Sequence, residues 1–211
     1  MAGRLRLRTW LAGLPPWVHW AGLGVAAAAG ALLARLADPA LLRWQPELAW
    51  AQPWRMVTAA WVHLSTQHLA GNLAATAVVA VFGVAAGCGR RAATAWALAW
   101  PLTQLGLLAQ PALLRYGGLS GVLHAGVAVA VWQLLRDGSR RRRAVGAAVA
   151  LMVLAKLLLE AAWQGPALRQ VPGWDIAIAP GAHASGVLAG WLCALACGVG
   201  SAADSARQRR P

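Results

Sequence analysis

Long apolar runs, separated by short clusters of arginine, leave few folds open to this chain. Six runs can be drawn, and each is close to the ~20 residues with which an α-helix crosses a ~30 Å hydrocarbon core. They cover approximately residues 17–36, 67–87, 92–110, 119–135, 144–163 and 180–200. Only 12% of the 211 residues are charged, whereas a soluble domain carries about a quarter. The sequence predicts an all-α membrane protein with six transmembrane helices in one membrane domain, residues 17–200.

The positions of the basic residues predict an orientation. With a cytoplasmic N-terminus, the cytoplasmic segments hold 13 of the 19 Lys and Arg residues, as the positive-inside rule requires. Residues 1–16 are then a basic cytoplasmic segment and residues 201–211 a basic cytoplasmic tail. Residues 1–16 lead into the first apolar run without the small-residue cleavage site of a signal peptide, so we expect this run to be retained.

The net charge of +13 does not indicate nucleic-acid binding. The basic clusters lie between apolar runs and are not interleaved with exposed aromatic residues on a soluble fold. The partner that they indicate is the lipid bilayer. The longest loop, residues 37–66, is rich in tryptophan, which favours the membrane interface. We expect this loop to lie half-sunk in the outer leaflet, although an ordinary aromatic belt also accounts for part of the pattern.

No metal or cofactor is expected. Cys193 and Cys197 lie one helical turn apart, where two thiols are poorly placed to form a disulfide. The cysteines and histidines lack zinc-site spacing, and there is no HExxH motif. All four aspartates fall in predicted loops or the tail, which excludes a membrane-buried aspartyl pair. The cysteines are expected to be packing residues.

Polar side chains within membrane spans are costly and are candidates for function. Ser120 is one, and it stands between Gly118 and Gly121 at the predicted start of a helix, where free amides and the helix dipole favour negative charge. It precedes Arg136, which marks the cytoplasmic interface, by 16 residues, or ~24 Å of helix. Ser120 should therefore lie below the outer surface. Small-residue helix packing is the alternative explanation, and it accounts for most patterns of this kind in membrane proteins.

His183 lies near the outer start of the sixth run. Gly186 and Gly190 follow it and form a small-residue face that permits close contact with another helix. Contact with the fourth run would bring His183 to Ser120 as a base. A hydrogen-bonding role between helices is the alternative. No acidic third member is evident, so the chemistry predicted is that of a Ser–His dyad.

Other polar positions form pairs one helical turn apart. His68 and Asn72 share a helix face and would suit an oxyanion site or interhelical hydrogen bonds. His124 follows the serine by one turn and would stack on the catalytic histidine or act as a second base. Lys156 and Glu160 are best interpreted as a structural ion pair, with gating or substrate recognition as the alternative.

Together these blocks resemble the signature of rhomboid intramembrane serine proteases. The blocks are Trp54-Arg55, His63, His68, Asn72, Gly118-Leu119-Ser120-Gly121 and His183 with Gly186 and Gly190. The resemblance implies a rhomboid fold, a Ser120/His183 dyad, and an oxyanion site made by His68, Asn72 and the Ser120 amide. It also implies supporting roles for Gly118, Gly121, His124, Gly186, Trp54 and Arg55, with the Trp54-Arg55 loop dipping into the outer leaflet.

One departure from that signature is informative. Many rhomboids carry Tyr where this chain has His124, and with its compact length the chain is similar to the rhombosortase branch. That branch implies a bacterial inner-membrane enzyme whose active site opens to the periplasmic side. Its substrates would be exported proteins with a C-terminal Gly-Gly, a membrane helix and a basic tail. The alternatives are a general rhomboid protease and a non-catalytic rhomboid-like protein that binds membrane helices.

Overall fold

The computed structural model describes residues 14–201. The predicted basic segments therefore lie almost wholly outside the described residues. Long helices form where the apolar runs predict them, with ends shifted by a few residues. Their bounds are α2 Trp17–Leu33, α5 Thr66–Ala85, α6 Arg90–Leu105, α7 Ser120–Leu135, α8 Arg140–Glu160 and α9 Pro180–Ala196.

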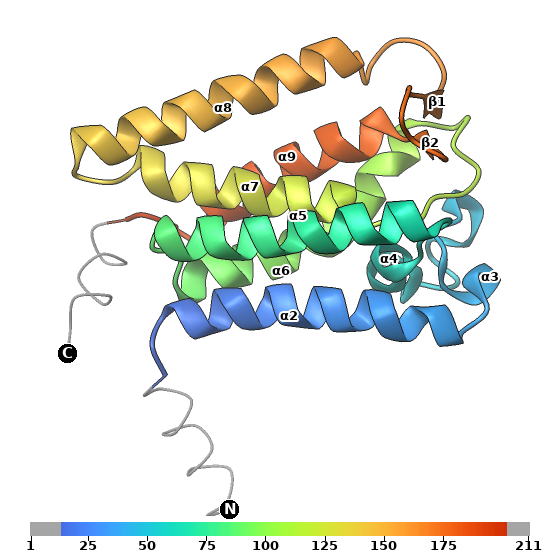
Figure 1. Cartoon of the computed structure of the whole chain (residues 1–211), viewed down its shortest axis with the longest axis horizontal. Coiled ribbons are helices and arrows are strands. Elements are labelled where there is room, and N and C mark those ends of the chain that lie inside the picture. The colour runs from blue at the N-terminus through green and yellow to red at the C-terminus, as the bar shows by residue number, and fades with distance from the viewer. Residues whose placement is uncertain (1–13, 202–211) are drawn as a thin grey trace, which may run out of the picture.

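Two helical stretches among the described residues are long and apolar enough to cross a membrane on length and composition alone. They are Trp17–Leu36, which is α2 with the 3-10 turn that follows it, and α5, while the apolar α7 is shorter. The helical architecture agrees with the predicted class, an all-α membrane protein. The first and last described residues lie at the same end of the bundle (Figure 1).

Helix α7 is central and packs against α5, α6, α8 and α9. Its contact with α9 depends on residues without side chains. A Cβ atom at Gly186 would overlap the carbonyl oxygen of Gly121, and one at Gly190 would overlap that of Ala125. Small residues let two helix backbones approach this closely, which is a common means of association in membranes.

Tryptophan fills the wider gaps between helices. The rings of Trp20 in α2 and Trp96 in α6 lie 4.5 Å apart, and both side chains are fully buried. Their indole N–H groups donate to helix carbonyls, Trp20 to Val79 at 3.2 Å and Trp96 to Val122 at 2.8 Å. A buried indole is stable there because its single donor is satisfied.

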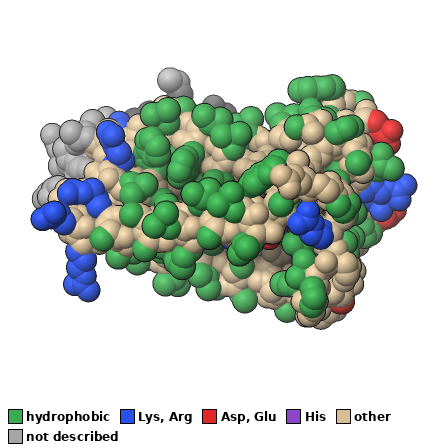
Figure 2. All heavy atoms as spheres, turned by 90° about the horizontal axis from the view of Figure 1, so that it is seen from above, with side chains coloured by type: hydrophobic (Ala, Val, Ile, Leu, Met, Phe, Trp, Pro, Cys, Tyr) green, Lys and Arg blue, Asp and Glu red, His purple; other side chains and the backbone are tan. Residues whose placement is uncertain are grey.

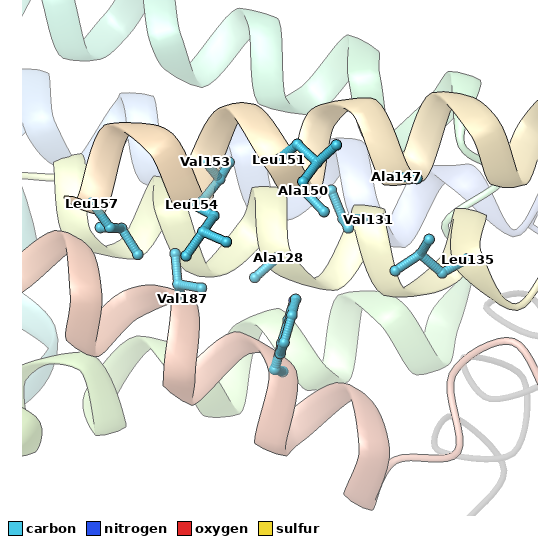
Figure 3. Close-up of a pocket in the computed structure, with 11 residues that line it drawn as sticks. Ala128, Val131, Leu135, Ala147, Ala150, Leu151, Val153, Leu154, Leu157 and Val187 are labelled. Atoms are coloured by element: carbon cyan, nitrogen blue, oxygen red, sulfur yellow. The ribbon is translucent and has the colours of Figure 1, made fainter. Parts of the chain in front are cut away.

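Helix α8 is packed much less completely than α7. Only Gly146 and Leu157 are buried among its residues. Figure 2 looks onto this side, where hydrophobic side chains are spread over the middle and Lys and Arg stand toward the two ends. An apolar groove of about 450 Å³ lies between α7, α8 and α9 (Figure 3). Apolar surface of this kind suits contact with lipid.

The loops at the other end of the bundle carry short elements (Figure 1). Between α2 and α5 lie η1 Ala34–Leu36, α3 Pro39–Leu42, η2 Pro46–Leu48, α4 Arg55–Thr58 and η3 Ala59–Trp61. Between α6 and α7 lies η4 Gly106–Ala109, and between α8 and α9 lie β1 Arg169–Gln170 and β2 Ala177–Ile178, which pair antiparallel.

The tryptophans of the first loop differ in exposure. Trp50 and Trp54 are exposed, as expected of interfacial residues, whereas Trp44 is fully buried. The backbone of Trp44 bridges that of Tyr116, with N–O distances of 2.8 and 3.1 Å. Trp44 is therefore a packing residue that joins the first loop to the segment before α7.

Candidate active site

Ser120 is the first residue of α7, and His183 lies in the first turn of α9. The Oγ of Ser120 lies 3.1 Å from Nε2 of His183. Gly121 directly follows Ser120, and Gly186 follows His183 by three residues. These two glycines form the close helix contact described above. The small residues that join α7 to α9 thus also set the distance between the hydroxyl and the imidazole.

The two side chains open into a cavity of about 580 Å³. Its lining comes from α5, α7, α8, α9 and the loops that precede α7 and α9. His68, Asn72, His124, Lys156 and Glu160 all line it. The cavity is large enough for a short stretch of extended peptide and brings together polar residues from four helices.

His68 and Asn72 present hydrogen-bond donors to this cavity. Both lie on α5 and are buried. Nδ2 of Asn72 makes no hydrogen bond within the described residues. The backbone N–H of Leu64 donates to Nδ1 of His68 at 3.5 Å, which leaves Nε2 of His68 as a donor. Unpaired buried donors are rare, and donors beside a nucleophile suit a developing oxyanion.

Gly118 allows His68 to come this close to the start of α7. Its φ of 139° lies in a region that residues with side chains rarely adopt. A Cβ atom there would lie 2.8 Å from Nε2 of His68. Tyr116 supports the same turn, because its hydroxyl donates to the Gly118 carbonyl at 3.1 Å. Burial raises the pKa of Tyr116, so this phenol remains a neutral donor.

His124 stacks on His183, with ring centroids 4.3 Å apart and planes inclined by 20°. Its Nδ1 lies 2.7 Å from the Ser120 carbonyl oxygen, so this nitrogen carries the proton and donates. Of the two predicted roles, this arrangement favours stacking, because the ring is held in place against His183.

Lys156 and Glu160 form an ion pair, as the sequence indicates, with Nζ 2.5 Å from Oε1. The other carboxylate oxygen, Oε2, lies 2.7 Å from Nδ1 of His183. No acidic partner for His183 was predicted from the sequence, so this contact was missed. A signal was available, because the predicted topology places Glu160 at the outer end of one span and His183 at the outer start of the next, at a similar depth.

Trp54 and Arg55 do not line the cavity. Arg55 is buried, and its Nη1 donates to the carbonyls of Ala40 and Arg43, both at 2.8 Å. Its Nε donates to Gln52 at 2.5 Å. Arg55 therefore holds the first loop together, while Trp54 remains half-exposed.

Residues 161–179 form a cap over the cavity and are attached to the start of α5. The side chain of Gln67 donates to the Gly173 carbonyl at 2.8 Å, and Ser65 donates to Asp175 at 2.8 Å. The ring of Trp174 lies against Gly71, where a Cβ atom would be 2.9 Å from it. These contacts connect the cap to the helix that carries His68 and Asn72.

His63 lies next to His68, with ring centroids 4.8 Å apart. Burial lowers the pKa of His63, and the nearby Arg35 lowers it further, against an opposing hydrogen bond with the Trp61 carbonyl. A neutral His63 adds no positive charge next to the cavity.

No group of three His, Cys, Asp or Glu side chains within residues 14–201 is arranged to hold a metal ion. Cys88 and Cys193 are buried in the hydrophobic core. The polar side chains that line the cavity include Ser120, three histidines and the Lys156–Glu160 pair.

The comparison with known families agrees with the geometry. A family model of the Rhomboid domain matches residues 51–199. This chain belongs to the rhomboid family, whose members are embedded in membranes and are generally intramembrane serine proteases. The search among curated proteins gave no match.

Proposed function

We propose that this chain is an active intramembrane serine endopeptidase with Ser120 as nucleophile and His183 as general base. The observation that carries the proposal is the 3.1 Å contact between Ser120 Oγ and His183 Nε2 beside a 580 Å³ cavity. Serine is a weak nucleophile until a base accepts its proton, and a hydrogen-bonded imidazole is the usual base near neutral pH.

The reaction follows from these positions. Nε2 of His183 accepts the Ser120 proton as Oγ bonds to the scissile carbonyl carbon. The carbonyl oxygen becomes an oxyanion, stabilised by His68, the Asn72 amide and the Ser120 backbone N–H at the start of α7. The C–N bond then breaks, and the proton passes from His183 to the leaving amine. Water resolves the acyl-enzyme, with His183 accepting a proton from water and returning it to Ser120.

We further propose that residues 17–200 cross the bacterial inner membrane six times, with both termini cytoplasmic. The first and last described residues lie at the same end of the bundle, which supports this topology. The excess of basic residues in the proposed cytoplasmic segments supports it as well. Ser120 and His183, at the opposite end of α7 and α9, would then lie near the periplasmic face.

The substrates proposed are single-span membrane proteins that carry a Gly-Gly before a membrane helix and a basic C-terminal tail. Glycine favours local unwinding of a helix and allows the peptide backbone to approach the serine without a side chain in the way. The cavity between α5, α7 and α8 suits an unwound segment of this kind.

Co-expression with a tagged substrate of this design tests the proposal. Mass spectrometry of the released C-terminus should locate cleavage beside the Gly-Gly, and both Ser120→Ala and His183→Ala should abolish it. Serine-dependent cleavage of a generic rhomboid substrate alone would keep the protease and reject the Gly-Gly specificity. Cleavage that survives Ser120→Ala would reject the serine mechanism, and a protein that binds but never cleaves would be a non-catalytic family member.

A further inference from the structure

The second nitrogen of the His183 ring faces a carboxylate from another helix. Oε2 of Glu160, the last residue of α8, lies 2.7 Å from Nδ1 of His183. We propose that Glu160 is a positioning residue that completes a Ser120–His183–Glu160 triad in place of the predicted dyad. The inference rests on the proposed serine-protease function and assigns the group that orients its base.

The contact selects one tautomer of His183. A carboxylate can only accept hydrogen bonds, so a proton on Nδ1 is attracted to Oε2, while a lone pair on Nδ1 would face a negative charge at 2.7 Å. With the proton on Nδ1, the lone pair is on Nε2, which lies 3.1 Å from Ser120 Oγ. That is the form of the ring that can accept the serine proton.

Glu160 is itself held in place. Lys156, one turn earlier on α8, donates to the other oxygen, Oε1, at 2.5 Å. The backbone carbonyl of Glu160 accepts a hydrogen bond from Arg169 at 2.7 Å. Helix α8 ends directly afterwards at Ala161, which has a left-handed φ of 43°. The carboxylate is thus fixed from its side chain and from its backbone.

Burial makes the contact strong. The side chain of Glu160 is 15% exposed and that of His183 is 8% exposed, and charged hydrogen bonds are stronger where water is excluded. When Ser120 gives its proton to Nε2, the ring becomes a cation directly beside this carboxylate. The glutamate stabilises that cation without accepting the proton, as the acidic member of a serine-protease triad does.

Lys156 would determine the tautomer of His183 if the Glu160 carboxylate were removed. Its Nζ lies 3.1 Å from Nδ1 of His183 as well as next to Glu160. If the carboxylate were replaced by an amide, Lys156 or the new amide N–H would donate to the single lone pair of Nδ1. The ring would then carry its proton on Nε2 and could not accept one from Ser120. A neutral side chain of the same shape should therefore inactivate the enzyme.

The test is the rate at which a fluorophosphonate probe labels Ser120 in the purified full-length protein, which reports serine activation without a protein substrate. The variants are Glu160→Gln and Glu160→Asp. Glu47→Gln, at an exposed glutamate in η2 away from the cavity, is the matched control. We expect labelling on the order of 1,000-fold slower in Glu160→Gln, partial recovery in Glu160→Asp, and the wild-type rate in Glu47→Gln.

Thermal unfolding of each variant separates positioning from stability. If Glu160 is a positioning residue, Glu160→Gln should be labelled slowly and should unfold at the wild-type midpoint. Glu160→Asp should recover part of the labelling rate because it restores the negative charge. Labelling of Glu160→Gln within about threefold of wild type would overturn the triad and leave the serine protease intact. Equal losses in both variants, together with a lower midpoint, would assign Glu160 a structural role instead. Absence of labelling in the wild type would reject the protease function and the triad with it.

Discussion

The helix pair α7–α9 and the helix α8 contribute to the same site in different ways. The pair is joined by direct backbone contact at Gly121, Gly186 and Gly190, and it carries Ser120 and His183. Helix α8 buries only two of its residues, and it carries Lys156 and Glu160. The nucleophile and its base therefore belong to a closely packed unit, whereas the carboxylate proposed to orient the base comes from a less buried helix.

Disrupting the contact between α7 and α9 should have the largest effect on activity and stability. Gly186→Ala places a methyl group where the Gly121 carbonyl lies, so α7 and α9 must separate and His183 must move away from Ser120. Overpacking costs about 1–3 kcal/mol, and misplacing a base by about 1 Å lowers turnover roughly 100-fold. Reporter cleavage and thermal unfolding measure the two effects.

Gly22→Ala is the matched control, because no atom lies within 4 Å of a Cβ at this helical position in α2. It should retain full activity and normal stability, with a small gain from helix propensity. An active and stable Gly186→Ala would contradict the account of the α7–α9 contact.

The stability difference between the two regions can be measured with one type of substitution. Val129 in α7 is fully buried, whereas Val145 in α8 is 47% exposed. Truncation to Ala should cost roughly 2 kcal/mol at Val129, where a cavity remains. At Val145 the cost should be below about 0.5 kcal/mol. Unfolding in mixed micelles gives both values, and similar costs would mean that α8 is packed as tightly as α7.

The smallest effect is expected at the cap over the cavity. Gln67→Ala removes the hydrogen bonds to the backbone of Gly173 and Asp175, each contributing about 1 kcal/mol or less at an exposed position. Limited proteolysis should cut residues 161–179 faster, with little change in global stability. Gln164→Ala, within the cap, is the control, because only the backbone of Gln164 makes hydrogen bonds among residues 14–201. Equal cleavage in both variants would show that the Gln67 contacts do not hold the cap.

Much of the architecture could be predicted because it depends on local pattern. The apolar runs predict the long helices to within a few residues, since a membrane span requires a minimum length. Scarcity of polar residues in those runs singled out Ser120 and His183, and the spacing of small residues indicated a close helix contact. The structure brings these two side chains together.

What the sequence did not predict depends on tertiary position. The sequence indicates that Glu160 forms an i,i+4 ion pair with Lys156. Its second contact, with His183, depends on how α8 and α9 lie relative to one another. Trp44 was predicted to be an interfacial residue, but it is buried against the segment before α7. Both are contacts between elements far apart in the chain, where local propensity carries no information.

The most direct test of the account is to map the fluorophosphonate adduct on the purified protein by peptide mass spectrometry. The account predicts one adduct, on Ser120, that disappears in Ser120→Ala and falls by orders of magnitude in His183→Ala because the serine is no longer activated. Labelling of another serine, or equal labelling of Ser120 in wild type and His183→Ala, would contradict it.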